Sequence, residues 1–200
     1  MGILGGVEGY FSIPCLKGNN VLIFRKKNNP KEASVAKIYT NAQAVRDSID
    51  KKKTITLVGG SFDLLHVGHV HLLEHAKKLG NILVACVLSD SNVSSYKGSR
   101  RPIIEEKYRA KMVASLRCIN RVFISEIDTS HEQVLSVIEP NNVIFGIEET
   151  EHWRTTAAKR ESFLKARFPN ISIHYLERFA DTSMSTSSII QKIINSHSSD

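Results

Sequence analysis

Residues 59–69 read Gly-Gly-Ser-Phe-Asp-Leu-Leu-His-Val-Gly-His, a segment in which glycines and two histidines flank a short apolar stretch. It follows residues 54–58, which favour a strand, and it leads into residues 67–79, whose apolar side chains recur at helical spacing. Glycines let the backbone approach a ligand closely, and the unpaired N–H groups at a helix start attract phosphate. The segment therefore predicts a phosphate-binding turn between a strand and a helix.

Strand and helix patterns alternate along the chain from residue 54 onward. We predict strands over residues 54–58, 82–88, 122–125, 143–145 and 171–176. We predict helices over residues 67–79, 105–116, 131–138, 152–168 and 185–194. Strands separated by helices are typical of a parallel sheet with helices on both faces. The predicted fold is α/β, a Rossmann-like doubly wound parallel five-stranded sheet that binds ligands beyond the carboxyl ends of its strands.

The first fifty residues follow this alternation poorly. Residues 20–24 favour a strand and residues 41–49 favour a short helix, with a polar segment between them. We therefore predict three parts: an N-terminal extension of unknown role over residues 1–50, a main domain over residues 51–195 and a tail over residues 196–200.

The composition is that of a globular protein with a basic surface. Of 200 residues, 42% are hydrophobic and 24% are charged, and the formal net charge is +7. A positive balance favours anionic partners such as nucleotides, nucleic acid or acidic membrane. The basic residues are scattered apart from residues 51–53 and the pair Arg100 and Arg101, and no motif indicates a nucleic-acid-binding protein. A phosphorylated small ligand explains the charge equally well.

Cysteine usage and hydropathy favour a reducing compartment. Cys15, Cys86 and Cys118 form no CxxC pair, which argues against a disulfide framework or a cysteine zinc site. The sequence shows no pattern of a secretory signal and no apolar run long enough to span a membrane. We therefore expect a cytoplasmic protein without a membrane span.

The two histidines of the first segment carry the strongest chemical signal. His66 and His69 lie three residues apart at the expected helix start, so both can face one ligand, and Gly68 between them leaves space for a phosphate. Two alternatives stay open. One is a zinc site that includes the nearby His71 and His75, and the other is a purely structural role for both histidines.

The order Gly-x-Phe-Asp-x-x-His-x-Gly-His after a first strand resembles the signature of the HxGH nucleotidyltransferases, the cytidylyltransferase-like family. The resemblance implies transfer of a nucleoside monophosphate from a nucleoside triphosphate to a phosphorylated small molecule, with release of pyrophosphate and Mg²⁺ as cofactor. It also implies a homodimer, because dimers are common in this superfamily. No protein nucleophile is needed, so catalysis would consist of positioning and charge stabilisation.

The resemblance extends to later segments and covers roughly residues 40–195. Lys97 begins a stretch similar to the family's Lys-Gly…Arg-Pro, so it would neutralise the leaving phosphates. Arg109 matches an arginine at a helix start and would hold phosphate or order a loop. Ser185 and Thr186 belong to a segment similar to Ile-Ser-Thr-Thr-x-x-Ile, so they would cap the last helix and hold phosphates.

These matches give a set of expected site residues. The expected catalytic residues are His66, His69 and Lys97. The expected nucleotide-binding residues are Gly60, Ser61, Phe62, Asp63, Gly68, Arg109, Gly146, Glu148, Ser185 and Thr186. Asp63 would fix its turn by accepting backbone N–H bonds, and no protein ligand is expected for Mg²⁺. Residues 146–149 read Gly-Ile-Glu-Glu where the family commonly has Gly-Gly-Asp or Gly-Asp-Asp, which leaves the acceptor open.

Two subfamilies and one other class of protein compete. The chain is similar to heptose 1-phosphate adenylyltransferases at residues 37–40, 89–93 and 128–129. Cytidylyltransferases that act on glycerol 3-phosphate, phosphoethanolamine or phosphocholine usually have Arg-Thr before the Ser-Thr motif, and residues 178–183 lack that pair in register. ATP is therefore favoured over CTP. The altered segment 146–149 also fits a degenerate module that binds a nucleotide without chemistry.

Overall fold

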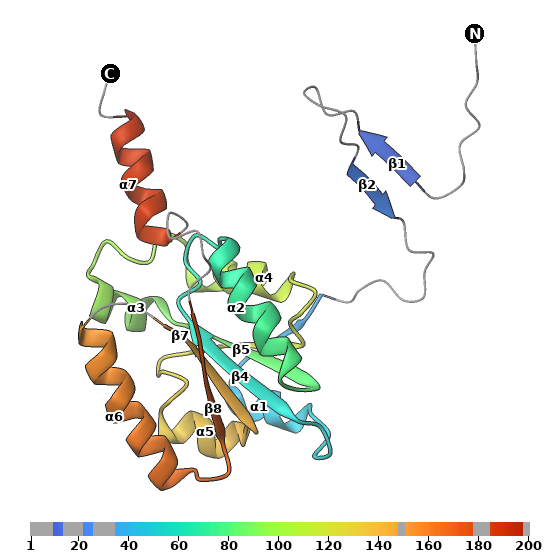
Figure 1. Cartoon of the computed structure of the whole chain (residues 1–200), viewed down its shortest axis with the longest axis vertical. Helices are drawn as coiled ribbons and strands as arrows, with labels where there is room; N and C mark the ends of the chain where they lie inside the picture. Colours follow the sequence, from blue (N-terminus) through green and yellow to red (C-terminus); the bar gives the residue numbers. More distant parts are fainter. Residues whose placement is uncertain (1–9, 14–21, 26–34, 148–150, 178–184, 198–200) are drawn as a thin grey trace. The chain divides into compact units, whose positions relative to one another are not determined.

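Among the described residues, six parallel strands form the central sheet of the chain (Figure 1). The computed structural model describes residues 10–13, 22–25, 35–147, 151–177 and 185–197. The strand order is β3-β6-β5-β4-β7-β8. The strands are β3 (Lys37–Tyr39), β4 (Ile55–Gly60), β5 (Ile82–Leu88), β6 (Arg121–Ser125), β7 (Asn142–Gly146) and β8 (Ser172–Leu176). The helices are α1 (Ala42–Asp47), α2 (Val67–Lys78), α3 (Asp90–Lys97), α4 (Glu106–Ala114), α5 (Glu132–Ile138), α6 (Glu151–Arg167) and α7 (Thr186–His197).

The chain divides into two units between Ser34 and Val35. In the first unit, β1 (Tyr10–Ile13) pairs antiparallel with β2 (Leu22–Arg25), which lies near the strand expected over residues 20–24. The second unit contains the sheet. It includes β3, which pairs with β6, and α1, which contacts α5 and β6. The sheet unit therefore begins well before residue 51, where the sequence placed the start of the main domain.

The structure confirms the Rossmann-like parallel α/β fold and adds one strand to the predicted five. The additional strand, β3, extends the sheet at the edge beside β6. It has only three residues, and two of them, Lys37 and Ile38, are exposed. A short edge strand with exposed side chains has no apolar run, so the sequence pattern did not reveal it.

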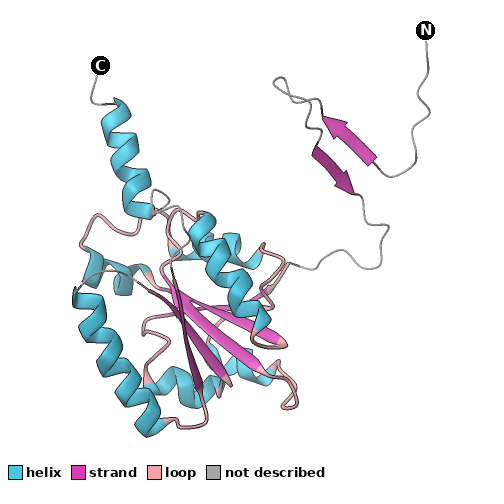
Figure 2. Cartoon of the chain, in the orientation of Figure 1, coloured by secondary structure: helices cyan, strands magenta, loops and turns pink. Residues whose placement is uncertain are grey.

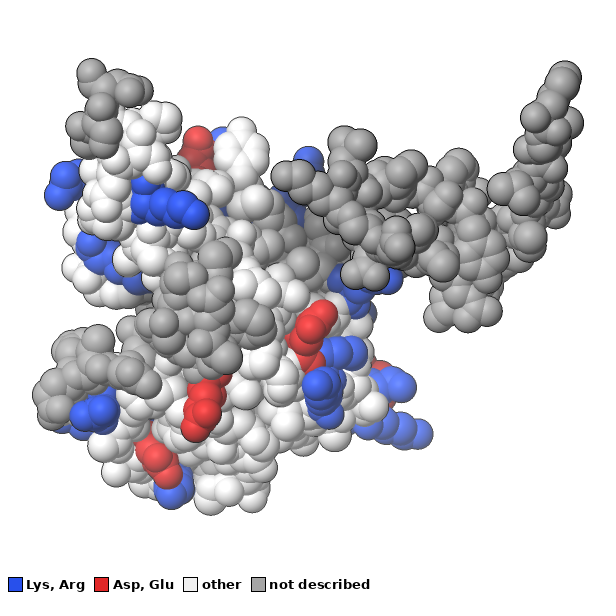
Figure 3. Space-filling view, turned by 45° about the horizontal axis from the view of Figure 1, so that its top comes forward, with Lys and Arg blue, Asp and Glu red and all other residues white. Residues whose placement is uncertain are grey.

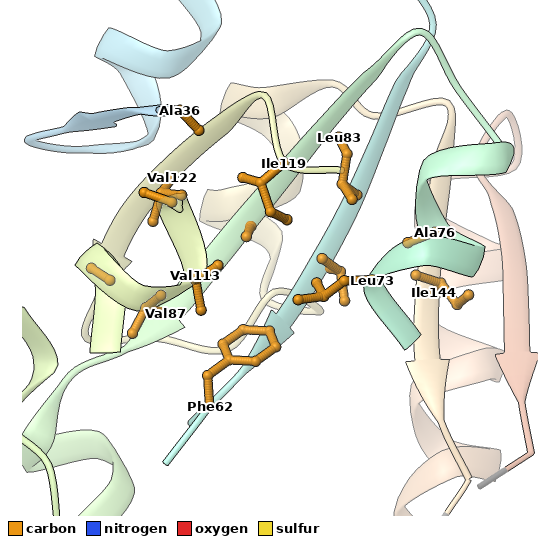
Figure 4. Close-up of a cluster of buried hydrophobic side chains, with 14 residues drawn as sticks. Ala36, Phe62, Leu73, Ala76, Leu83, Val87, Val113, Ile119, Val122 and Ile144 are labelled. Atoms are coloured by element: carbon orange, nitrogen blue, oxygen red, sulfur yellow. The ribbon is translucent and has the colours of Figure 1, made fainter. Parts of the chain in front are cut away.

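Helices cover both faces of the sheet, as predicted (Figure 2). Consecutive residues of β4 point to opposite faces: Val58 packs in a cluster with side chains of α2 and α4, whereas Leu57 packs with side chains of α1, α5 and α6. Figure 4 shows the first cluster, which includes the labelled side chains Phe62, Leu73, Ala76, Leu83, Val87, Val113, Ile119, Val122 and Ile144.

Within the described ranges, no helix has both the length and the apolar character needed to cross a membrane.

Two local expectations are corrected by the structure. Gly59 and Gly60, expected in a turn, are the last residues of β4 and are paired with Cys86 and Val87 of β5. Helix α3 occupies a stretch for which no helix was predicted. Its sequence is mostly polar, and Val93 is its one buried residue among the eight that the structure describes, so no apolar periodicity marks it as a helix.

Candidate functional site

The loop after β4 lies at the point where the strand order of the sheet reverses. β5 and β6 lie on one side of β4, whereas β7 and β8 lie on the other. Parallel α/β sheets bind ligands beyond the carboxyl ends of the strands at such a switch point. Residues 61–66 leave β4 at this end and lead into α2, so they line the position at which a ligand is expected.

Phe62 and Leu64 give this loop an uncommon backbone conformation. Both have a backbone φ of 48°, in the left-handed region that residues other than glycine rarely adopt. The Phe62 ring is buried against the core cluster (Figure 4), and Asp63 between the two residues is fully buried as well. The surrounding contacts determine this conformation, and residues held in this way concentrate at functional sites.

Asp63 connects the loop to a second segment of the site. Its two carboxylate oxygens accept hydrogen bonds from the backbone N–H groups of Ile103 and Ile104, at 2.9 and 3.0 Å. The Arg101 Nε and Nη2 atoms each lie 2.9 Å from the Asp63 Oδ2 atom. We expected this carboxylate to fix its own turn, but it fastens residues 101–104 instead. Nothing in the sequence pattern indicated Arg101 as its partner, although the Arg-Pro step was part of the matched motif.

His66 and His69 cap the start of α2 reciprocally. The His66 Nδ1 atom accepts a hydrogen bond from the Gly68 N–H at 3.2 Å. The His69 Nδ1 atom accepts one from the His66 N–H at 3.3 Å, which completes a capping box. An Nδ1 atom that accepts a hydrogen bond carries no proton, so each neutral ring has its proton on Nε2. Both rings therefore offer an N–H donor at a helix start whose dipole attracts anions.

His69 is held in its neutral form. The pKa of His69 is lowered to about 3, chiefly by burial and also by the electrostatic effects of His66 and Lys97, against a smaller opposing effect of Asp63. The His69 ring lies 3.9 Å from the His66 ring and 5.5 Å from the Phe62 ring, measured between centroids. A neutral imidazole is a fixed hydrogen-bond donor, so this site can stabilise charge without exchanging a proton.

Lys97 reaches the same loop from another element. It is the last residue of α3, and its Nζ atom donates a hydrogen bond to the Ser61 Oγ atom at 3.1 Å. Gly98 caps the end of α3, and its φ of 90° disfavours a side chain. The structure therefore brings together His66, His69 and Lys97, the three residues expected to be catalytic.

Arg109 orders the site from inside the protein. Its guanidinium is fully buried and donates to the carbonyl oxygens of Ser61, Leu88 and Ile104, the last two at 2.8 and 2.7 Å. Its Nη2 atom also pairs with the Asp90 Oδ1 atom at 2.7 Å. Of the two roles expected from the sequence, loop ordering is the one that these contacts support, because the guanidinium is engaged with protein acceptors.

Ser185 and Thr186 bring the last helix to the loop. The Ser185 Oγ atom accepts a hydrogen bond from the Ser188 N–H at 3.1 Å, as expected for a helix cap. The Thr186 Oγ1 atom donates to the carbonyl oxygen of Asp63 at 2.8 Å. The start of α7 thus lies beside the loop that leaves β4, although 123 residues separate Thr186 from Asp63 in the chain.

The remaining residues expected to bind the nucleotide lie at the same edge of the sheet or outside the described part of the chain. Gly60 and Gly146 end the neighbouring strands β4 and β7. A Cβ atom on Gly60 would meet the Phe62 ring at 3.3 Å, whereas one on Gly146 would find its nearest atom, on Leu72, at 3.9 Å. Glu148 falls in residues 148–150, outside the described part of the chain.

The alternative of a zinc site finds no support in the described residues. Among them, no group of three or more His, Cys, Asp or Glu side chains is arranged to hold a metal ion. The His75 Nδ1 atom lies 2.9 Å from the carbonyl oxygen of His71, and the two rings are 4.3 Å apart. This pair belongs to α2 itself and has no third ligand within that part of the chain.

Gly59 makes room for a neighbouring side chain of the protein itself. We expected its missing side chain to make room for a ligand, but the space is filled by Thr129. A Cβ atom on Gly59 would lie 2.4 Å from the Thr129 Cγ2 atom. Thr129 is buried. The segment that follows β6 passes the carboxyl end of β5, and this brings Thr129 to β4. Residues 128–129 were matched to the family in the sequence, but the packing of Thr129 against Gly59 is visible only in the structure.

Comparison with known proteins agrees with this geometry. Residues 57–192 match the family model described as cytidylyltransferase-like. The bifunctional protein HldE of Citrifermentans bemidjiense is 32% identical over 166 residues, which cover 83% of this chain and 32% of that protein. The FAD synthase of Thermococcus sibiricus is 34% identical over 145 residues, which cover 72% of this chain and 95% of that protein. The chain thus spans only about a third of the HldE protein but nearly all of the FAD synthase.

Solved structures share the fold at lower identity. The lipopolysaccharide core biosynthesis protein from Thermoplasma volcanium superposes with a TM-score of 0.52 at 23% identity, over 64% of this chain and 98% of that one. The pantoate-beta-alanine ligase from Francisella tularensis gives a TM-score of 0.54 at 17% identity, over 82% of this chain and 80% of that one. At these identities the likeness concerns the fold alone.

Proposed function

This chain belongs to the cytidylyltransferase-like family, and from that premise we propose that it transfers the adenylyl group of ATP to the phosphate of a small molecule such as a sugar phosphate. The observation that carries the proposal is the gathering of donors at the carboxyl end of β4. His66 and His69 each present an Nε2–H donor at the start of α2, and Lys97 bonds to Ser61 in the same loop.

The chemistry is an in-line displacement at phosphorus. An oxygen of the acceptor phosphate attacks the α-phosphorus of ATP and forms a new P–O bond. The bond from the α-phosphorus to the bridging oxygen breaks, and pyrophosphate leaves with that electron pair. No proton has to move to a protein base, because the attacking oxygen is already ionised at neutral pH. The protein therefore contributes positioning and charge stabilisation.

Each group has a part in this step. The Nε2–H donors of His66 and His69 bind phosphate oxygens as their negative charge increases, and the low pKa of His69 keeps its ring neutral, with Nδ1 as acceptor and the proton on Nε2. The Lys97 ammonium neutralises the leaving phosphates as a point charge. The start of α7, capped by Ser185, provides further N–H groups for the same phosphates.

Mg²⁺ fits this site as a companion of the triphosphate. The described residues contain no group of three carboxylate, imidazole or thiol side chains that would hold a metal without a ligand. Mg²⁺ commonly keeps several waters and is bound largely through substrate phosphates. When bound, it supplies charge neutralisation at the phosphates that Lys97 and the helix starts contact.

The choice of ATP is supported by a relative, and the choice of the acceptor class by matched segments of the sequence. One relative is an FAD synthase, whose product contains an adenylyl group, and it matches 72% of this chain. The sugar-phosphate acceptor is supported by the sequence similarities at residues 37–40, 89–93 and 128–129. Transfer of a cytidylyl group from CTP to glycerol 3-phosphate, phosphoethanolamine or phosphocholine is the alternative within the family.

A matrix assay tests the proposal. The purified chain is incubated with Mg²⁺ and each of ATP, CTP, GTP and UTP against sugar phosphates, polyol phosphates, phosphorylated amino-alcohols and flavin mononucleotide, and pyrophosphate release is followed. We expect pyrophosphate release with ATP as the nucleotide and a sugar phosphate as the acceptor. Release with CTP alone would reverse the nucleotide assignment. Nucleotide binding by calorimetry without release in any combination would favour the degenerate binding module.

Two further expectations accompany this proposal. We expect no binding of nucleic acid; on the face shown in Figure 3, the Lys and Arg side chains that the structure describes stand in separate groups with acidic side chains between them. Retention on DNA that falls steeply with salt would contradict that expectation.

We also propose a homodimer, and light scattering of the purified chain will give its mass directly.

A further inference from the structure

Helix α3 carries Lys97 at its end, yet it has little apolar packing of its own. Among its eight residues, all of which the structure describes, only Val93 is buried. Most of a helix's stability in a protein comes from the packing of an apolar face. The orientation of α3 therefore depends largely on polar contacts, and several of these lie at its first turn, at the end opposite to the bond between Lys97 and Ser61.

Glu126 supplies contacts on one side of that turn. It follows β6, and its Oε2 atom accepts hydrogen bonds from the hydroxyl groups of Ser89, at 2.7 Å, and of Ser91. Its backbone carbonyl accepts a further bond from the Asn92 Nδ2 atom at 2.7 Å. The hydrogen bonds from Ser91 and Ser89 lower the pKa of Glu126, so its carboxylate is ionised at neutral pH.

A second group of contacts holds the other side of the turn. The Asp90 carboxylate pairs with the buried Arg109 guanidinium at 2.7 Å, and its backbone N–H donates to the Glu106 Oε2 atom at 2.7 Å. Ser89, the cap of α3, is itself 1% exposed. The first turn thus lies between Glu126 on one side and α4 on the other.

The length of α3 amplifies any movement at this turn. Eight helical residues span about 12 Å. A tilt of about 5° at the start displaces the far end by about 1 Å, and a displacement of that size can lower a rate by about 100-fold. We infer that Glu126 is a positioning residue for the reaction: it orients α3 and thereby sets where the Lys97 ammonium lies. This inference rests on the proposed function of Lys97.

A double-mutant cycle tests the inference. We expect Glu126→Ala to lower kcat about 10-fold in the wild-type background and less than about 2-fold in a Lys97→Ala background, because Glu126 acts through the position of the Lys97 ammonium. The matched control is Glu132→Ala, which removes an exposed ion pair with Arg167 and should leave kcat unchanged in both backgrounds. An equal loss in both backgrounds, or no loss in either, would overturn the inference.

A second measurement separates this inference from the proposed function. Hydrogen–deuterium exchange of the ligand-free protein reports the order of α3 whether or not a substrate is known. We expect faster exchange at the amides of Val93 to Gly98 in Glu126→Ala and wild-type exchange there in Glu132→Ala. Wild-type exchange of α3 in Glu126→Ala would show that Glu126 does not orient the helix, even if turnover is absent from every variant.

Discussion

The imidazole rings of His66 and His69 lie 3.9 Å apart, and the Nδ1 atom of each is occupied by a backbone N–H of the same helix start. The two rings therefore have a structural edge that caps α2 and a second edge, Nε2–H, that can donate to a ligand. This division separates two roles that replacement by alanine would remove together. It also suggests a substitution that removes only one of them.

His66→Asn is expected to abolish most activity while preserving the fold. Asparagine is among the best helix caps, so its side-chain oxygen can replace the Nδ1 acceptor, but it is too short to replace the Nε2–H donor. We expect kcat to fall about 100- to 1000-fold, with a change in the free energy of unfolding below about 0.5 kcal/mol. His66→Ala should lose activity equally and also lose about 1 kcal/mol of stability. Near-normal turnover in His66→Asn would show that this ring serves the helix only.

The low pKa of His69 predicts a pH-dependent stability. An unfolded histidine has a pKa near 6.5, whereas the pKa of His69 is lowered to about 3, first by burial and then by His66 and Lys97. Between these pH values the unfolded chain binds a proton that the native protein does not. The free energy of unfolding should therefore fall as pH falls from 6.5 to 3, by up to about 1.4 kcal/mol per pH unit from this residue.

The variant His69→Gln isolates that contribution. Urea denaturation of both proteins at several pH values gives two stability curves, and their difference removes the shared effect of the carboxylates. We expect the wild type to lose stability more steeply than His69→Gln over this interval. Parallel curves would mean that His69 titrates normally in the folded protein.

Arg109 is expected to be sensitive even to lysine. Its buried guanidinium contacts three carbonyl groups and the Asp90 carboxylate, and a lysine ammonium cannot reach this set from one position. We expect Arg109→Lys to lower the free energy of unfolding by about 3 to 5 kcal/mol, because acceptors and a partly buried charge lose their partner. Arg167→Lys, in an exposed ion pair with Glu132, should change it by less than about 1 kcal/mol. Similar losses in both variants would contradict the scaffold role of Arg109.

Periodic features were predictable from the sequence. The strand over Ile82–Leu88 was predicted with its observed bounds, since a strand buried on both faces reads as a continuous apolar run. The helix after the first histidine was found because its apolar side chains recur at helical spacing, and it begins and ends within one residue of the prediction. His66 and His69 were predicted from a motif of fixed order, and Lys97 from a second segment similar to the family's Lys-Gly…Arg-Pro.

Features that depend on distant contacts were not predictable. Helix α3 is specified by contacts of its first turn with Glu126 and Arg109, which lie elsewhere in the chain, and not by its own pattern. The partner of Gly59 is Thr129, 70 positions away in the chain, so the reason for that glycine is visible only in three dimensions. The same is true of the bonds that fasten residues 101–104 to Asp63.

The packing of Gly59 against Thr129 predicts a substitution with a matching rescue. A Cβ atom at residue 59 would lie 2.4 Å from Cγ2 and 2.6 Å from Oγ1 of Thr129, distances at which the neighbour must move. We expect Gly59→Ala to lower the free energy of unfolding by about 1 to 3 kcal/mol. The same change in a Thr129→Ala background should cost about 1 kcal/mol less, because both close atoms are gone. Gly146→Ala is the control, since its nearest neighbour, on Leu72, lies at 3.9 Å. Equal costs in both backgrounds would show that another contact excludes a side chain at residue 59.

Thr186 offers the last test, since one hydrogen bond connects the start of α7 to the loop that leaves β4. Its Oγ1 atom donates to the Asp63 carbonyl oxygen at 2.8 Å, and valine has nearly the same shape without the hydroxyl. If the start of α7 binds the phosphates, Thr186→Val should weaken nucleotide binding about 3- to 10-fold, a loss of about 1 kcal/mol typical of one hydrogen bond. Ser187→Ala, at the neighbouring exposed position, should leave the affinity unchanged. Isothermal titration of ATP into both variants measures this directly and needs no knowledge of the acceptor. Wild-type affinity in Thr186→Val would mean that α7 caps the loop without taking part in nucleotide binding, and the phosphate contacts would then fall to α2 and Lys97 alone.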